Sequence, residues 1–332
     1  MVKCVLFSVC LDQLRSNNIL TQGYRFATNS AKNMVSNIRT FLYFCTYFGL
    51  DALPASTTTL CLFAELMAQT VTFGHIKNIM SSIKYLHAAY NYEYPSNDFG
   101  LDTTLQGLKR KLSRTPFQVL PVTPKILKIM YNFLDMRRTS DLARWCSFLV
   151  AFFCLFRKKN TVPEFSAPSK EKTLLRRHIE VDVENNLVYI YCNFSKTNQF
   201  GSSNLVIPVP GNDDPCLDLV KHLATLFIRV DVDMDKPAFS YSQSSFIHYK
   251  LFTDRLKSLL TQAGFDARLY SGHSFRRGGA SFLYQVGGSI LQIMSSGDWS
   301  SSCFTRYLFL TEEERMDAQL LMSSALSEGC SK

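Results

Sequence analysis

The spacing of apolar residues predicts helices throughout residues 28–94. Apolar side chains recur there at intervals of three and four residues, which places them on one face of a helix. Three such stripes are present: Val35, Ile38, Leu42 and Cys45; Leu60, Phe63, Ala64 and Met67; and Ile76, Ile79, Ile83 and Leu86. Strand-like alternation is absent from this stretch of sequence, so we predict a small helical bundle with these stripes in its core.

A proline and a basic run mark the end of this predicted bundle. Pro95 is followed by residues 108–116, in which Lys109, Arg110, Lys111 and Arg114 precede a second proline. A charge run closed by a proline is typical of a linker. The sequence therefore predicts two domains, residues 1–115 and residues 116–332, with a basic linker at the end of the first.

The second predicted domain mixes helices with a small sheet. Thr123-Pro124 is typical of a helix start, and the apolar run from Trp145 to Phe156 follows it. This run falls short of the roughly 20 residues that cross a membrane, so we predict a core helix and no membrane segment. Strands are predicted at residues 179–183, 187–192 and 204–209, and helices at 217–230 and 246–263, the last ended by Gly264. The predicted fold class is mainly α with a small antiparallel β-sheet (α+β).

Composition and charge narrow the class of partner. The chain has 332 residues, 46% of them hydrophobic, which suits two well-packed domains. Its net charge is +9, with 36 Lys and Arg against 27 Asp and Glu. Basic clusters gain affinity by releasing counterions from nucleic acid, so a polyanionic partner is favoured. Charge alone does not distinguish DNA from RNA or from a membrane surface.

Two features of the sequence bear on the compartment. Ten cysteines are scattered without a Cys-x-x-Cys pair, which favours a reduced, intracellular protein. Residues 1–7, apolar apart from Lys3, faintly resemble a signal peptide, but Asp12 and Arg15 follow and no small-x-small cleavage site does. We therefore expect no secretion.

The chemistry of the chain is concentrated near residue 275. The segment Gly272-His273-Ser274-Phe275-Arg276-Arg277-Gly278-Gly279 precedes Gly297-Asp298-Trp299 and then Tyr307. His273 and Arg276 are three residues apart, so on a helix they face the same way and can bind one small anion. A phosphate group is the natural candidate.

Residues in this order resemble the tyrosine recombinase (phage-integrase-like) family. The matching positions are Arg157, Lys196, His273, Arg276, Trp299 and Tyr307, in the motifs 155–160, 195–197, 272–278 and 297–301. The motifs look most like those of recombinases from eukaryotic mobile elements of the DIRS and crypton types. The resemblance implies a helical core-binding (SAM-like) domain followed by a tyrosine recombinase catalytic domain.

The resemblance also implies a role for each of these residues. Arg157 and Arg276 are expected to clamp the phosphodiester, since guanidinium groups donate planar pairs of hydrogen bonds to its oxygens. Tyr307 is expected to be the nucleophile that forms a 3′-phosphotyrosyl bond, with no metal and no nucleotide cofactor.

Three further residues complete the expected site. Lys196, on the tip of a hairpin, is expected to be the general acid that protonates the leaving 5′ oxygen. His273 is expected to hydrogen-bond the phosphate and to help move the tyrosine proton, and Trp299 to pack the site. Asn160 stands where the family commonly has a carboxylate. Asp298 occupies the slot nine residues before the tyrosine where the family usually has His or Trp.

The expected partners are double-stranded DNA and further copies of the chain, in the nucleus. Expected DNA contacts are Lys77, Lys84, Lys109, Arg110, Lys111 and Arg114. Taken singly, each candidate residue also has an ordinary structural explanation, such as a solvated lysine or a core histidine. Two other functions are open at this point. They are a DNA-binding protein domesticated from a mobile element, without catalysis, and a topoisomerase of type IB chemistry.

Overall fold

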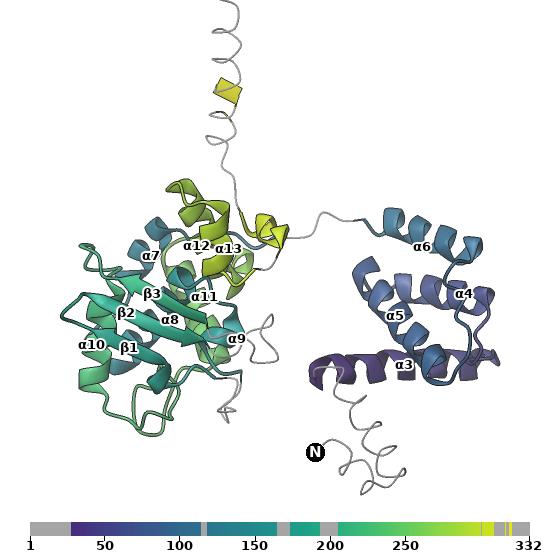
Figure 1. The fold of residues 1–332 in the computed structure, drawn as a ribbon, viewed down its shortest axis with the longest axis horizontal. Helices are drawn as coiled ribbons and strands as arrows, with labels where there is room; N and C mark the ends of the chain where they lie inside the picture. The colour runs from purple at the N-terminus through teal and green to yellow at the C-terminus, as the bar shows by residue number, and fades with distance from the viewer. Residues whose placement is uncertain are drawn as a thin grey trace, which may run out of the picture. The chain divides into compact units, whose positions relative to one another are not determined.

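The structure is a computed structural model that describes residues 28–113, 118–164, 173–192, 205–299, 301–308, 316, 319 and 320. The chain divides into two compact units, residues 1–116 and residues 117–332 (Figure 1). The division falls one residue from the predicted domain boundary.

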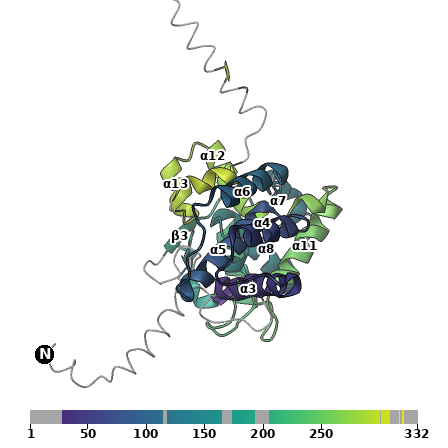
Figure 2. The same ribbon diagram turned by 90° about the vertical axis from the view of Figure 1, so that its right-hand side faces the viewer.

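The first unit is a helical bundle (Figure 2). Its helices are α3 (Thr28–Phe48), α4 (Thr57–Ala68), α5 (Phe73–Ala89) and α6 (Phe99–Lys111). The second and third predicted stripes lie in its core, with Met67 and Leu86 half-buried at the edge. Ser56 caps α4 by accepting a hydrogen bond from the Thr59 amide at 3.1 Å, which satisfies one of the unpaired N–H groups of the first turn.

The prediction for the first stripe was right for Cys45, which is buried, and wrong for Val35 and Leu42. Val35 is 52% exposed and Leu42 is exposed too, whereas Phe41 and Phe44 point into the core. Both rings pack on Phe63, with centroids 5.1 and 5.0 Å away. Aromatic rings bury a large apolar surface, so the contacts of these two phenylalanines with Phe63 favour this face of α3 turning inward.

The basic run was also assigned to the wrong kind of structure. Lys109, Arg110 and Lys111 form the last turn of α6 and not a linker, while Arg114 lies outside the described residues. Asp98 caps this helix with hydrogen bonds from the amides of Gly100 and Leu101. Cations in the last turn complement the negative end of the helix dipole, so the charge run stabilises a helix that the sequence pattern had not indicated.

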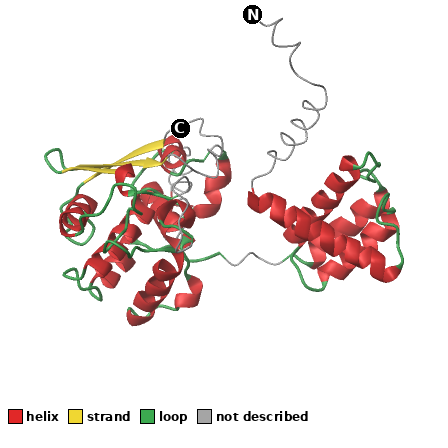
Figure 3. Ribbon diagram, turned by 90° about the horizontal axis from the view of Figure 1, so that it is seen from below, coloured by secondary structure: helices red, strands yellow, loops and turns green. Residues whose placement is uncertain are grey.

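The second unit carries the sheet. Its helices are α7 (Pro124–Tyr131), α8 (Thr139–Phe153), α9 (Lys158–Thr161), α10 (Leu219–Arg229), α11 (Tyr249–Gln262), α12 (His273–Gln285) and α13 (Ile290–Ser296), with short 3-10 turns η2 (Arg176–His178), η3 (Ala267–Leu269) and η4 (Ser302–Tyr307). Strands β1 (Ile179–Asp182), β2 (Leu187–Cys192) and β3 (Leu205–Pro210) pair antiparallel in the order β1-β2-β3. In Figure 3 the strands lie at one side of the unit and helices fill the rest.

The predicted fold class is confirmed: the described chain is mainly α with a small antiparallel sheet. The predicted run from Trp145 to Phe156 forms most of α8 and the turn after it, and almost all of it is buried. Thr123 caps α7 ahead of Pro124, and Gly264 ends α11 with a φ of +81°. Within the described residues, no helix is long and apolar enough to span a membrane.

Candidate active site

Two adjacent glycines bring α12 close to two other segments. A Cβ atom on Gly278 would overlap the carbonyl of Val122, and one on Gly279 would overlap the carbonyl of Phe152 in α8. The Val122 amide also donates to the carbonyl of Ser274 at 2.9 Å. Only glycine permits this approach, which sets the first turns of α12 beside the end of α8.

Arg276 joins the segments around this helix. Its residue surface is only 2% exposed. One terminal nitrogen donates to the carbonyl of Leu155, and the other donates to the carbonyl of Gly297 at 2.6 Å. One side chain on α12 therefore ties the turn after α8 to the turn after α13.

Both turns contain a residue in the left-handed region. Leu155 has a φ of 48° and Asp298 a φ of 51°. Residues other than glycine adopt this conformation rarely, and such positions gather at functional sites where the surroundings hold them in place. Here Arg276 bonds the carbonyl of Leu155 itself and the carbonyl just before Asp298.

Trp299 and Tyr307 cover the Arg276 guanidinium. Its central carbon lies 3.9 Å from the ring centroid of Trp299 and 5.2 Å from that of Tyr307. The two rings are 5.2 Å apart between centroids. Trp299 and Phe304 belong to a small apolar cluster, separate from the main core, on which half-buried Tyr307 rests. The Ser281 hydroxyl donates to the Tyr307 carbonyl at 3.4 Å.

Arg157 and Arg276 are close enough to influence each other. Burial and, second to it, the positive charge of Arg157 lower the pKa of Arg276 to about 10, while Tyr307 and Asp298 act in the opposite direction. Arg157 itself has no ion pair and no side-chain hydrogen bond within the described part of the chain. An anion between the two guanidiniums would relieve their repulsion.

The structure thus gathers four of the six predicted catalytic residues: Arg157, Arg276, Trp299 and Tyr307. His273 begins α12 and is half-buried, three residues before Arg276. Lys196 lies outside the described residues. Asn160 donates its amide to the Cys192 sulfur at 3.6 Å, so it links α9 to the end of β2.

The predicted DNA-contact residues that the structure describes belong to the first unit. Lys77 and Lys84 are exposed on α5, and Lys109 and Arg110 are exposed at the end of α6. Lys111 is exposed as well, but its amino group lies 3.5 Å from a Glu65 oxygen, so part of its charge is already balanced.

One positioning residue was missed in the sequence. Arg277 is buried and donates to the carbonyl of Val119 at 3.0 Å, which fastens α12 to the segment that leads into α7. The doubled arginine before two glycines was the available signal. A single sequence does not reveal which arginine faces the site and which faces the scaffold.

Neither a protein-family profile nor a curated protein matches the chain. Among solved structures, the chain resembles the XerH site-specific recombinase in a post-cleavage complex with its difH substrate (TM-score 0.57, 12% identity, 86% of this chain and 76% of that one). It also resembles the Tn1549 transposon integrase bound to circular intermediate DNA (0.55, 13%, 92% and 98%) and a lambda integrase dimer bound to a core site (0.55, 12%, 89% and 93%).

The chain has the tyrosine recombinase fold. The agreement extends over most of each chain, although few residues are identical. In this fold, the Arg276 guanidinium contacts the rings of Trp299 and Tyr307. Both rings come from segments more than twenty residues further along the chain.

Proposed function

We propose that this chain is a site-specific recombinase that cleaves and rejoins double-stranded DNA through a covalent bond to Tyr307. The observation that carries the proposal is the placement of the Arg276 guanidinium against the rings of Trp299 and Tyr307, next to the charge of Arg157. A phenol beside two cations suits attack on a phosphodiester, because the attacking and non-bridging oxygens both carry negative charge.

In the proposed reaction, the Tyr307 oxygen attacks phosphorus and the bond from phosphorus to the 5′ oxygen breaks. The tyrosine loses its proton, and Lys196 supplies one to the departing 5′ oxygen. Arg157, Arg276 and His273 bind the non-bridging oxygens. A 5′ hydroxyl of a second DNA strand then attacks the phosphotyrosine, which restores a phosphodiester and releases Tyr307. The covalent bond conserves the energy of the DNA linkage.

The proposal includes the partners of the enzyme. Exposed cations of the first unit would bind phosphates: Lys77, Lys84, Lys109, Arg110 and, more weakly, Lys111, which is paired with Glu65. Arg114 is included from the sequence alone. Strand exchange needs two DNA sites, so copies of the chain would assemble on DNA, and a eukaryotic mobile-element origin would place the protein in the nucleus.

A covalent-adduct assay tests the proposal. Wild type, Tyr307→Phe and the matched control Tyr284→Phe are incubated with nicked candidate DNA without divalent metal, then run on denaturing gels. Tyr284 is exposed in the same unit and outside the site. We expect a protein–DNA band with wild type and Tyr284→Phe and none with Tyr307→Phe. An equal band with Tyr307→Phe would remove Tyr307 as the nucleophile.

One observation favours a second candidate, a DNA-binding protein without catalysis. Both terminal nitrogens of Arg276 already donate to main-chain carbonyls, and the residue is almost fully buried. This candidate predicts binding to DNA with no adduct from any variant across a broad set of DNA ends. A type IB-like topoisomerase would instead form the adduct without preference for a defined site and would relax supercoiled plasmid.

A further inference from the structure

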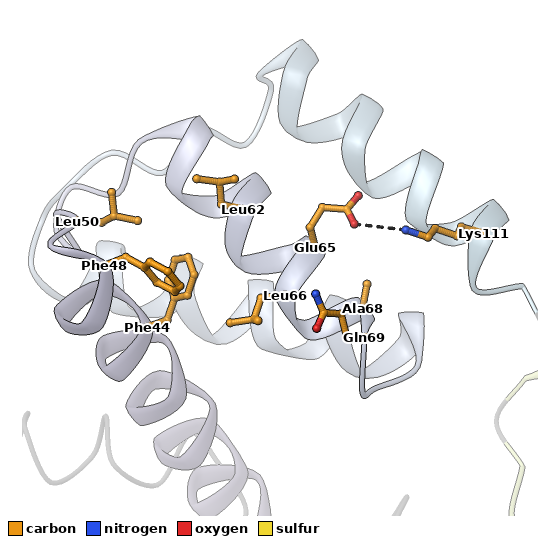
Figure 4. A pocket seen from close by; sticks show the side chains of 9 residues that line it. All are labelled: Phe44, Phe48, Leu50, Leu62, Glu65, Leu66, Ala68, Gln69 and Lys111. Carbon is orange, nitrogen blue, oxygen red and sulfur yellow. Dashed lines mark ion pairs between the residues drawn. The ribbon is translucent and has the colours of Figure 1, made fainter.

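The first unit has an apolar groove that the proposed reaction does not use. It lies between the end of α3 and α4 and encloses about 580 Å³ (Figure 4). Six apolar residues line it, with polar residues at one side: Phe44, Phe48, Leu50, Leu62, Leu66 and Ala68, then Glu65, Gln69 and Lys111. Phe48 is 55% exposed, Leu62 53% and Leu66 41%. Three neighbouring apolar side chains that are this exposed are suited to contact an apolar ligand.

DNA is a poor occupant for this groove. Among the described residues, Lys111 is the only cation in its lining, and its amino group pairs with Glu65 at 3.5 Å. The other lining residues are uncharged, and most are apolar. Phosphate contacts need free cations, so the lining of this groove fits an apolar ligand better than DNA.

The chain itself contains an apolar segment of suitable composition. Residues 2–14 precede α3 and lie outside the described residues. Nine of these positions are apolar or cysteine: Val2, Cys4, Val5, Leu6, Phe7, Val9, Cys10, Leu11 and Leu14. We propose that this segment binds in the groove of its own chain, with Phe7 as the anchor because it has the largest side chain of the nine.

The connection is long enough for this binding. Phe44 is sixteen residues beyond the start of α3, a distance of about 24 Å along the helix. Residues 15–27, fully extended, span about 45 Å. Tethering on this scale gives an effective concentration on the order of millimolar, which favours the chain's own segment over that of a second copy. The groove volume also lies within the roughly 300–1,000 Å³ of ordinary ligand sites.

Photo-crosslinking of the full chain tests this inference. Phe7 is replaced by the photoreactive p-benzoylphenylalanine, the protein is irradiated, and crosslinked peptides are identified by mass spectrometry. We expect crosslinks within one chain to residues 44–69. A crosslinked dimer would assign the groove to the segment of a second copy. Crosslinks elsewhere, or none, would overturn the proposal.

Matched variants connect the crosslink to the groove. In the Phe7-labelled chain, Leu66→Gln and, separately, Phe48→Gln should each lower the crosslink yield at least fivefold. Ile228→Gln, at an 82% exposed position in the other unit, should leave the yield unchanged. Circular dichroism confirms that each variant is folded. Two groove positions are tested so that the experiment still gives an answer if one variant does not fold. An unchanged yield in both groove variants would overturn the proposal. The result is independent of whether the chain cleaves DNA.

Discussion

At the scale of single residues, Arg276 has two tasks that the sequence does not separate. It holds the turns at Leu155 and Gly297 through their carbonyls, and it presents a cation to Trp299 and Tyr307. Lysine has a single ammonium group and cannot bond both carbonyls in this planar way. Arg276→Ala therefore removes both sets of contacts and the charge, whereas Arg276→Lys keeps the charge but not both carbonyl bonds.

We expect Arg276→Ala to slow adduct formation about 100- to 1,000-fold, the usual effect of losing one preorganised donor to a developing anion. Arg276→Lys should recover little of this loss. Single-turnover cleavage of nicked DNA measures the rate, and fluorescence anisotropy checks that binding persists. The control is Arg268→Ala, an exposed arginine whose ion-pair partner among the described residues is Asp266. Near-normal cleavage by Arg276→Ala would place the phosphate clamp elsewhere.

At the scale of elements, close backbone approach decides where α12 sits. Gly278 and Gly107 are both glycines inside helices, yet their surroundings differ. A Cβ on Gly278 would overlap the Val122 carbonyl, whereas one on Gly107 in α6 would meet nothing within 4 Å. The same substitution should therefore have opposite effects at the two positions.

Gly278→Ala should destabilise the second unit by about 1–3 kcal/mol, because the backbone must shift to admit the methyl group. Gly107→Ala should stabilise the first unit by about 0.5–1 kcal/mol, because alanine loses less backbone freedom in a helix. Both tryptophans of the chain, Trp145 and Trp299, belong to the second unit, so their fluorescence during urea unfolding reports on that unit. Circular dichroism follows the loss of helix in both units, so the part of its change that fluorescence does not account for reports on the first unit. Effects of the same sign at both positions would contradict this account.

The sequence predicted most elements but not how they are set against each other. Capping residues and helical spacing are local signals, and they identified α7, α10 and α11 within a few residues. The inward face of α3 depends on which of two apolar stripes meets Phe63, a contact made across the bundle. Likewise, the partners of Arg276 are main-chain carbonyls in turns at Leu155 and Gly297, and a backbone atom leaves no trace in the sequence.

His222 on α10 makes the second unit sensitive to acid. Its Nε2 donates to the carbonyls of Pro215 and Cys216, 3.1 and 3.2 Å away, and burial lowers its pKa below the usual value. The unfolded state therefore takes up the proton first. Stability from this residue is complete above the unfolded pKa of about 6.5 and falls as the pH drops below it, by at most about 1.4 kcal/mol per unit.

His222→Gln should flatten this pH dependence, because an amide donates to the same carbonyls without titrating. Urea unfolding followed by tryptophan fluorescence at pH 7.5 and pH 5.5 gives the two free energies for each variant. His75→Gln, at an exposed position in the first unit, is the control. Equal slopes for wild type and His222→Gln would show that other groups set the acid sensitivity.

At the scale of the whole molecule, the net charge of +9 predicts that DNA affinity falls as the salt concentration rises. On the proposed function, exposed and unpaired lysines of the first unit contact phosphates and release counterions. Each contact contributes about 0.9 to the slope of log affinity against log salt concentration. Lys84 and Lys111 differ usefully here, because only Lys111 shares its charge with a carboxylate, Glu65.

Lys84→Ala should lower the salt slope by about 0.9 and weaken binding equally for all DNA sequences, as expected for a phosphate contact. Lys111→Ala should lower it by less, because its ion pair with Glu65 already balances part of the charge. Anisotropy titrations between about 50 and 200 mM salt measure both slopes. An unchanged slope for Lys84→Ala would show that Lys84 on α5 does not contact DNA phosphates. A larger drop for Lys111→Ala would mean that DNA displaces Glu65 and binds along the end of α6.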